Sequence, residues 1–305
     1  MLQPHVLRKI EVSGTSMPRK RAGEDKENLQ VFRIQVFEDV GDVYKKLDLV
    51  WENATAGQIT PDHRVLIKIN LNTGDPYPAS TCPVMLSALI DFLRSKGIHD
   101  IWVGDCSSIS ALPTRKVAEQ TKVLAALRGK ARIVCFDEEA WVRVPIQGIY
   151  LKHVTLPQIA LDADRIISLA NLKTHRHSDY SFGLKLSVGF MHPLERYPLH
   201  HDHLSEKIAE ISLALQPDLT IIDGRTAFIT GGPEQGRTEK AGIVIVGGNP
   251  LAVDFEAYRT MYSLKRKYAC LEGFVEDPFE TAQLGHGRDI GLVGLSWQNY
   301  ECVEL

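Results

Sequence analysis

The sequence is poor in cysteine, and its five cysteines are scattered. No two of them form a C-x-x-C pair, so the ligand spacing of zinc ribbons, ferredoxin-type clusters and thioredoxin motifs is lacking, and we expect no iron–sulfur cluster. An odd number of widely spaced cysteines is typical of a reducing compartment. The N-terminal residues lack the apolar stretch of a signal peptide, and no apolar run approaches the roughly 18 residues that span a bilayer. We therefore expect a cytoplasmic protein without a membrane partner.

An excess of charge of one sign is also lacking. The chain of 305 residues has 35 basic and 38 acidic side chains and a formal net charge of −3, so no overall field attracts nucleic acid or an anionic membrane. A basic stripe interleaved with aromatic side chains, typical of single-stranded nucleic-acid binding, does not occur either. With 44% hydrophobic residues the chain can form a sizeable core, which excludes a disordered chain. We expect no nucleic-acid partner, and the oligomeric state stays open.

Apolar runs alternate with helical patterns from Val31 onward. Residues 13–30 are mostly polar or charged and have few apolar side chains to bury, which predicts that residues 1–30 form a mobile tail. The expected strands are Val31–Phe37, Val65–Leu71, Ile101–Asp105, Arg132–Phe136, Ala163–Leu169, Leu219–Ile222 and Ile243–Val246. The expected helices are Val84–Leu93, Thr114–Leu127, Leu204–Leu215 and Leu251–Met261. This alternation predicts an α/β fold for residues 31–305, with a mainly parallel, Rossmann-like sheet covered by helices on both faces, in one unit or two tightly joined lobes.

Several expected strands end in polar residues. Lys68 and Asn70 close one strand, Asp105 closes another and Asp223 a third. In parallel sheets, ligands bind beyond the carboxyl ends of the strands. We therefore expect these side chains to contribute to substrate binding at one edge of the sheet.

Histidine is concentrated in one segment. Six of the eleven histidines are His175, His177, His192, His200, His201 and His203. Imidazole titrates near neutral pH and also binds metal ions, so two interpretations compete. In the first, the H-x-H and H-H-x-H spacings provide a divalent metal site, for which zinc, nickel and iron are all suitable. Its candidate ligands are His175, His177, His200 and His203.

Lysines among apolar residues favour the second interpretation, an anion-binding or acid–base site. Lys68, Lys173 and Lys185 each lie in an apolar stretch, where an ammonium must meet an anion or lose its proton. A carboxylate or phosphate ligand would be that anion, and nearby histidines would move protons. An internal ion pair with a buried aspartate is the alternative for each lysine. The catalytic candidates are Lys173, His175, Lys185, His200 and His201.

The stretch 231–236 is rich in glycine but matches neither a Walker loop nor a dinucleotide fingerprint. A backbone without side chains lets a phosphate or carboxylate approach closely. We expect Gly232 and Gly236 to contact the small anionic ligand.

The order of these motifs resembles the family called domain of unknown function 362. The resemblance rests on Val65–Leu71, Val103–Asp105, Leu172–His175, Gly183–Lys185, Asp223–Gly224, Gly232–Gly236 and Leu251–Asp254. Some members carry a ferredoxin-like iron–sulfur segment, for which this chain has no cysteine set. The family is more remotely similar to the N-terminal domain of lactate-racemase-type proteins, which use histidines and a lysine around a nickel-containing nucleotide. That resemblance implies a small carboxylate substrate.

These patterns predict an enzyme that acts on a small anionic substrate, a carboxylate or a phosphate. The chemistry would be lysine and histidine acid–base catalysis of the isomerase or lyase kind, with or without a divalent metal. The alternative is a metal- or cofactor-binding accessory protein without turnover of its own. The first prediction depends on the lysines and histidines converging on one pocket.

Overall fold

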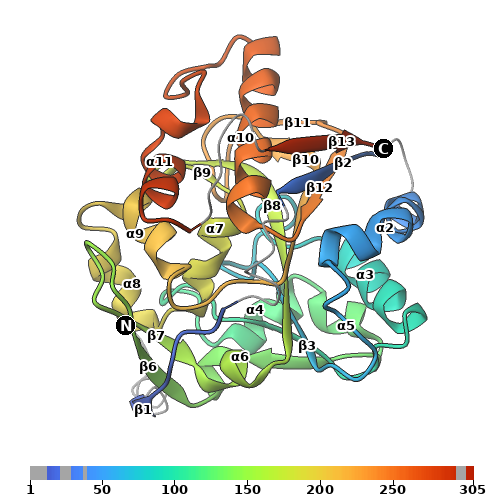
Figure 1. Cartoon of the computed structure of the whole chain (residues 1–305), viewed down its shortest axis with the longest axis vertical. Coiled ribbons are helices and arrows are strands. Elements are labelled where there is room, and N and C mark those ends of the chain that lie inside the picture. Colours follow the sequence, from blue (N-terminus) through green and yellow to red (C-terminus); the bar gives the residue numbers. More distant parts are fainter. Residues whose placement is uncertain (1–11, 21–28, 37–39, 293–299) are drawn as a thin grey trace.

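The computed structural model describes residues 12–20, 29–36, 40–292 and 300–305, and Figure 1 shows their arrangement. The strands are β1 (Val12–Thr15), β2 (Gln30–Gln35), β3 (Val65–Lys68), β4 (Ile101–Asp105), β5 (Arg132–Cys135), β6 (Trp141–Pro145), β7 (His153–Pro157), β8 (Arg165–His175), β9 (Asp179–Ser181), β10 (Leu219–Phe228), β11 (Thr238–Glu239), β12 (Ile243–Gly247) and β13 (Glu301–Glu304). The helices are α2 (Val40–Thr55), α3 (Pro83–Ser95), α4 (Thr114–Gln120), α5 (Val123–Leu127), α6 (Gln158–Asp162), α7 (Gly183–Leu186), α8 (Pro193–Leu199), α9 (Leu204–Ile211), α10 (Pro250–Lys267) and α11 (Ala282–Asp289). Within these described ranges, no helix has both the length and the apolar character needed to cross a membrane.

Most strands form one large sheet with the order β13-β2-β12-β10-β8-β3-β4-β5. From β10 to β5 neighbouring strands run parallel, and Leu66 of β3 is in register with Trp102 of β4 and Ile166 of β8. Strand β12 runs antiparallel to both of its neighbours, so the sheet is mixed. Strand β3 is buried along its whole length, as expected for a strand in the middle of a covered sheet. The chain therefore has an α/β fold with a mostly parallel sheet.

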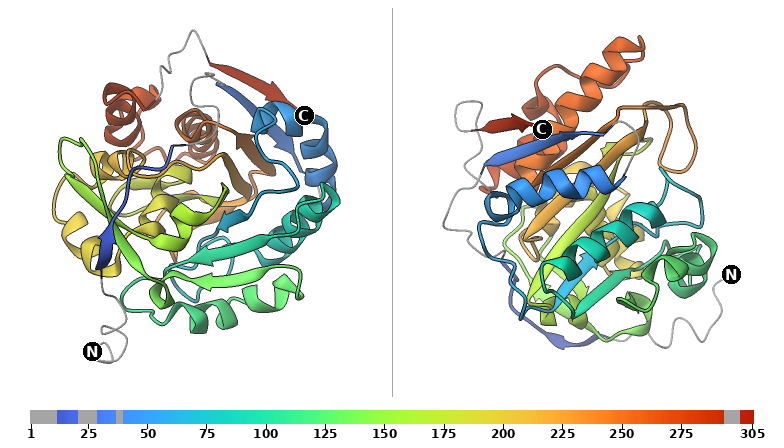
Figure 2. Two further views of the ribbon diagram at one scale, coloured as in Figure 1. Left: turned by 60° about the horizontal axis from the view of Figure 1, so that its bottom comes forward. Right: turned by 90° about the vertical axis from the view of Figure 1, so that its right-hand side faces the viewer.

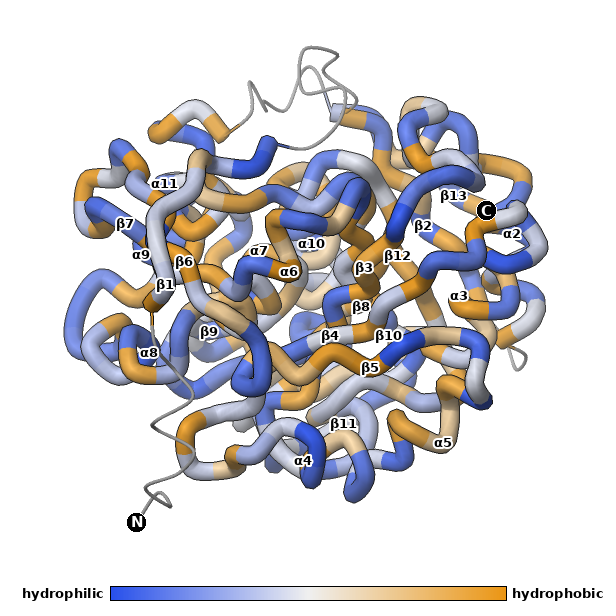
Figure 3. Tube along the Cα trace, turned by 90° about the horizontal axis from the view of Figure 1, so that it is seen from below, coloured by the Kyte–Doolittle hydropathy of each residue, from blue (hydrophilic) through white to orange (hydrophobic). Residues whose placement is uncertain are grey.

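Each face of the large sheet is covered by its own hydrophobic core. Successive residues of a strand point to opposite faces, and Ile221 and Ile222 of β10 accordingly belong to different cores. The first core includes side chains of α2, α3 and α5, and the second includes those of α7, α9 and α10. Figure 2 shows the ribbons of these two groups of helices on opposite sides of the sheet. Strands β6 and β7 of the smaller sheet, β1-β6-β7, also pack into the second core. Figure 3 shows the contrast in hydropathy between the apolar strand β5 and the mostly polar outer helix α4.

Part of the segment expected to be a mobile tail is packed against the rest of the chain. Val12–Thr15 form β1, which pairs with β6. The guanidinium of Arg19 forms an ion pair with Asp218 at 2.7 Å and donates a hydrogen bond to the carbonyl of Gln216. These contacts are made by backbone groups and by one arginine side chain. They could not be predicted from the polar composition of the segment, which shows only that few apolar side chains can be buried. Residues 1–11 and 21–28 of the expected tail lie outside the described residues.

Two elements differ from the expected ones in ways that matter for the site. The strand expected at Ala163–Leu169 is part of β8, which continues to His175. Lys173 and His175 therefore lie two residues apart on one strand, and their side chains point to the same side. The helix expected at Thr114–Leu127 is divided into α4 and α5, because Lys122 adopts a left-handed φ of 62°. Helix α2 and the β6–β7 hairpin were not expected.

Candidate functional site

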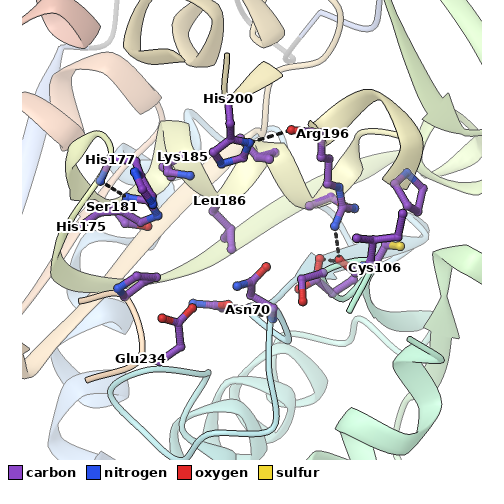
Figure 4. A pocket seen from close by; sticks show the side chains of 18 of the residues that line it. Asn70, Cys106, His175, His177, Ser181, Lys185, Leu186, Arg196, His200 and Glu234 are labelled. Atoms are coloured by element: carbon purple, nitrogen blue, oxygen red, sulfur yellow. Dashed lines mark hydrogen bonds between the residues drawn. The ribbon is translucent and has the colours of Figure 1, made fainter. Parts of the chain in front are cut away.

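A pocket of about 390 Å³ lies at the carboxyl ends of β3, β4 and β8 (Figure 4). Its walls come from distant parts of the chain: the residues after β3 and β4, the end of β8, α7, α8 and the loop that holds Pro233 and Glu234. The predicted site residues that line it are Lys68, Asn70, Asp105, Lys173, His175, His177, Lys185 and His200. The strand ends thus meet at one pocket, which has the size of a small-molecule site.

Lys68 and Asp105 neutralise each other beside this pocket. The fully buried ammonium of Lys68 donates to a carboxylate oxygen of Asp105 at 2.7 Å and to the carbonyl of Ile69. The same carboxylate accepts hydrogen bonds from the backbone N–H groups of Leu71 and Cys106. Burial lowers the pKa of Lys68, and the charge of Asp105 opposes this shift. Lys68 therefore has the internal ion pair that was the alternative for each lysine.

Two other lysines of the pocket have no acidic partner within the described residues. Lys173 is 3% exposed and donates to the carbonyls of Ala79 at 2.6 Å and Pro233 at 3.4 Å. Lys185 is 9% exposed and, in the part of the chain described, forms neither a hydrogen bond nor an ion pair. Burial lowers the pKa of Lys173 to about 7 and that of Lys185 to about 8. The charge of Lys185 adds to the first shift and that of Arg196 to the second, while the charge of Glu234 opposes both. Both amines therefore face the pocket without a carboxylate in contact.

Arg196 of α8 is a third cation of the pocket, and it was not among the predicted site residues. Its buried guanidinium donates to the backbone carbonyls of Met191, Cys106, Ser107 and Gly189. Across the described ranges it contacts no carboxylate. Backbone carbonyls thus accept hydrogen bonds from four of the five N–H groups of the guanidinium. These bonds fix its plane and leave one N–H for a ligand. In the sequence only its position within the histidine-rich segment could have drawn attention to it.

His175 and His200 are held in different tautomers (Figure 4). Nδ1 of His175 accepts a hydrogen bond from the backbone N–H of His177 at 3.1 Å, so the neutral ring carries its proton on Nε2. Nδ1 of His200 donates to the carbonyl of Arg196 at 2.6 Å, which leaves a lone pair on Nε2. Burial and the nearby lysines lower the pKa of His175 to about 2, so this ring stays neutral. One ring can donate a hydrogen bond to a ligand, and the other can accept a proton.

The predicted four-histidine metal site does not assemble. His203 lies outside the pocket, where its ring stacks on Tyr150. Among the described residues, no group of three or more histidine, cysteine, aspartate or glutamate side chains is placed to hold a metal ion. The Nε2 proton of His175 also opposes coordination through that atom. The catalytic candidate His201 is exposed and packs against Tyr197, outside the pocket lining.

Asp223 does not line the pocket, although it was a candidate for substrate binding. Its carboxylate forms an ion pair with Arg225 at 2.7 Å and accepts a hydrogen bond from the hydroxyl of Tyr77 at 3.0 Å. The charge of this strand end is therefore neutralised within the protein.

The candidate glycines also lie outside the pocket lining. Gly232 has a φ of 74°, and a Cβ at this position would collide with the carbonyl oxygen of Thr174, while one at Gly236 would collide with a carbonyl of its own loop. The missing side chains allow the chain to pack closely on itself at both positions. Between the two glycines, Glu234 does line the pocket and pairs with Arg176 at 2.7 Å.

Comparison with known proteins places the pocket within the part of the chain that matches a known family. The chain is 28% identical over 206 residues to the thylakoid-associated protein sll1697 of Synechocystis sp., a match that covers 65% of this chain and 62% of that protein's length. The lactate racemase apoprotein of Thermoanaerobacterium thermosaccharolyticum is similar at 11% identity and a TM-score of 0.39, over 81% of this chain and 60% of that one. The profile of the family described as Domain of unknown function (DUF362) matches residues 65–259, which include every residue that lines the pocket. Because this match covers more than half of the chain, the protein belongs to the DUF362 family.

Proposed function

We propose that the protein binds a small anion, a carboxylate or a phosphate, in this pocket and acts on it by lysine and histidine acid–base chemistry. The observation that carries the proposal is a set of three buried cations, Lys173, Lys185 and Arg196, without a carboxylate partner in the described ranges. Burying a charge without a counter-charge costs on the order of several kcal/mol, and one pocket lined by three such groups favours a negative ligand.

Internal neutralisation is the competing explanation for these cations. It applies to Lys68, which pairs with Asp105. It explains the other three less well: the charge of Glu234 opposes the lowering of the pKa of Lys173 and of Lys185, but Glu234 contacts neither amine and pairs with Arg176 at 2.7 Å. The lowered pKa values of the two lysines indicate how the pocket avoids the charge without an anion. Some of the amine groups lose their proton, and a bound anion would restore it on the lysine that it contacts.

The histidine tautomers support chemistry beyond binding. The Nε2–H of neutral His175 would donate a hydrogen bond to an oxygen of the bound anion, as a neutral imidazole can do to polarise a carbonyl. The lone pair on Nε2 of His200 would accept a proton from the ligand. A donor and an acceptor in one pocket suit proton transfer of the isomerase or lyase kind.

A thermal-shift screen with small carboxylic acids and inorganic phosphate tests the proposal. We expect at least one anion, at about 100 times its dissociation constant, to raise the Tm of the wild-type protein by about 5 °C. We expect Lys173→Met and Lys185→Met, which remove a charge and keep a long unbranched side chain, to lose most of this shift. Lys265→Met is the matched control, because Lys265 is also 3% exposed and also donates to a carbonyl, that of Ile229, but lies outside the pocket.

Two results would contradict the proposal. The first is that no acid and no phosphate shifts the Tm of the wild-type protein. The second is that the two pocket variants shift as much as the control variant, which would place the anion elsewhere.

A further inference from the structure

Lys185 differs from every other lysine discussed above, because its amine touches no hydrogen-bond acceptor and no carboxylate within the described residues. Lys68 is held by Asp105, and Lys173 donates to the carbonyl of Ala79 at 2.6 Å. Those two amines have their protons directed at fixed acceptors, which suits them to act as cations. The amine of Lys185 has no such acceptor, so its lone pair remains available to react.

The backbone of Lys185 is nevertheless fixed. The N–H groups of Gly183 and Leu184, which begin the short helix α7, donate to the two carboxylate oxygens of Asp254 at 2.8 and 2.9 Å. Asp254 is fully buried on α10. Lys185 thus combines an anchored backbone with an amine that has no partner in the described part of the chain and lines the pocket. A reactive group is positioned on a rigid support in this way.

We propose, building on the anion site above, that Lys185 is a nucleophile that forms a Schiff base with a 2-oxo acid bound in this pocket. Nζ adds to the carbonyl carbon of the acid. The carbonyl oxygen then leaves as water together with both protons of the neutral amine, and a C=N bond joins Lys185 to the substrate. No oxidant or reductant takes part in this step.

The surroundings of Lys185 match this chemistry. A lysine becomes nucleophilic when it is desolvated or lies beside other cations, and both conditions hold here. Burial is the main cause and Arg196 the second cause of its lowered pKa of about 8. Lys173 and the remaining N–H of Arg196 would hold the carboxylate of the acid, and Nε2–H of His175 would donate to its carbonyl oxygen. A 2-oxo acid carries both of these groups on neighbouring carbons.

Reductive trapping tests the proposal. The full chain is incubated at pH 8 with glyoxylate, pyruvate or 2-oxoglutarate and sodium cyanoborohydride, which reduces the C=N bond to a stable amine, and adducts are located by peptide mass spectrometry. At pH 8 the neutral fraction of an amine with a pKa of about 8 is roughly 100 times that of an ordinary lysine. We therefore expect at least one acid to label Lys185 at least about tenfold more than any exposed lysine. We expect Lys185→Met to lose the specific adduct and Lys265→Met to keep it.

The outcomes separate this inference from the proposed function. If anions stabilise the wild-type protein but none of the three acids labels Lys185 preferentially, the Schiff base is wrong and the anion site stands. If the protein neither binds anions nor forms the adduct, both are wrong. Because the adduct is located within the wild-type chain, the result does not depend on whether Lys185→Met folds.

Discussion

Asp105→Ala is expected to lower the free energy of unfolding by about 3–5 kcal/mol, as found when one partner of a buried ion pair is removed. The variant would leave the ammonium of Lys68, which is fully buried, with the carbonyl of Ile69 as its remaining partner. It would also leave the N–H groups of Leu71 and Cys106 without their acceptor. Urea unfolding monitored by circular dichroism measures the loss.

Two further variants make this prediction specific. Glu138→Ala breaks the ion pair between Arg115 and Glu138, which is of similar length but largely exposed, so we expect a loss below about 1 kcal/mol. In a Lys68→Met background, Asp105→Ala leaves no buried ammonium without a partner. It should therefore lower the free energy of unfolding by less than half as much as in the wild-type protein. Equal small losses for Asp105→Ala and Glu138→Ala would show that the Lys68–Asp105 pair is not buried as described.

Lys185→Met is expected to have the opposite effect and to raise the free energy of unfolding of the ligand-free protein by about 1–3 kcal/mol at pH 6. The amine has no partner in the described part of the chain, and lowering its pKa from 10.5 to about 8 corresponds to about 3 kcal/mol of lost stability for the charged form. The folded state releases this proton near pH 8, whereas the unfolded chain keeps it to about pH 10.5. The loss of unfolding free energy caused by Lys185 is therefore complete below pH 8 and becomes smaller as the pH rises toward 10.5. The stabilisation by Lys185→Met should become smaller over the same range.

Lys265→Met is again the control for this measurement. Its ammonium donates to the carbonyl of Ile229 at 2.9 Å and lies 4.7 Å from the ring centre of Phe274, so its removal should cost about 1 kcal/mol. Urea unfolding at pH 6 and pH 10 measures both variants. Destabilisation by Lys185→Met at pH 6 would contradict the account, because it would mean that the amine makes a favourable contact in the ligand-free protein. A gain would fit a residue kept for binding at the expense of stability.

The α/β fold and the edge of the sheet where the pocket lies could be predicted from local patterns. The apolar run at Val65–Leu71 marked a central strand, and the polar residues that follow such strands marked the edge where the pocket lies. The β1 strand could not be predicted in this way, because it is held by backbone hydrogen bonds and its side chains are exposed. Helix α8 was also missed, and with it the position of Arg196.

The roles of individual side chains within the pocket could not be predicted from the sequence. Lys68 and Lys185 both lie among apolar residues, yet among the described residues only Lys68 contacts a carboxylate, because β4 is the neighbour of β3 and places Asp105 beside it. His175 and His203 looked equally suited to bind a metal, but one lies at the end of β8 and the other on the exposed turn before α9. These differences depend on strand order and on turn geometry, which residue spacing does not encode.

The most direct measurement is calorimetric titration of the protein with the carboxylate that gives the largest thermal shift, in buffers that differ in ionisation enthalpy. Because burial lowers the pKa of Lys173 to about 7 and that of Lys185 to about 8 without a ligand, both amines are largely neutral at pH 8.5 and largely charged at pH 6. Binding at pH 8.5 should therefore take up about one to two protons for each anion, and binding at pH 6 should take up almost none. Binding without proton uptake at pH 8.5, with the same affinity at both pH values, would show that these lysines do not hold the anion.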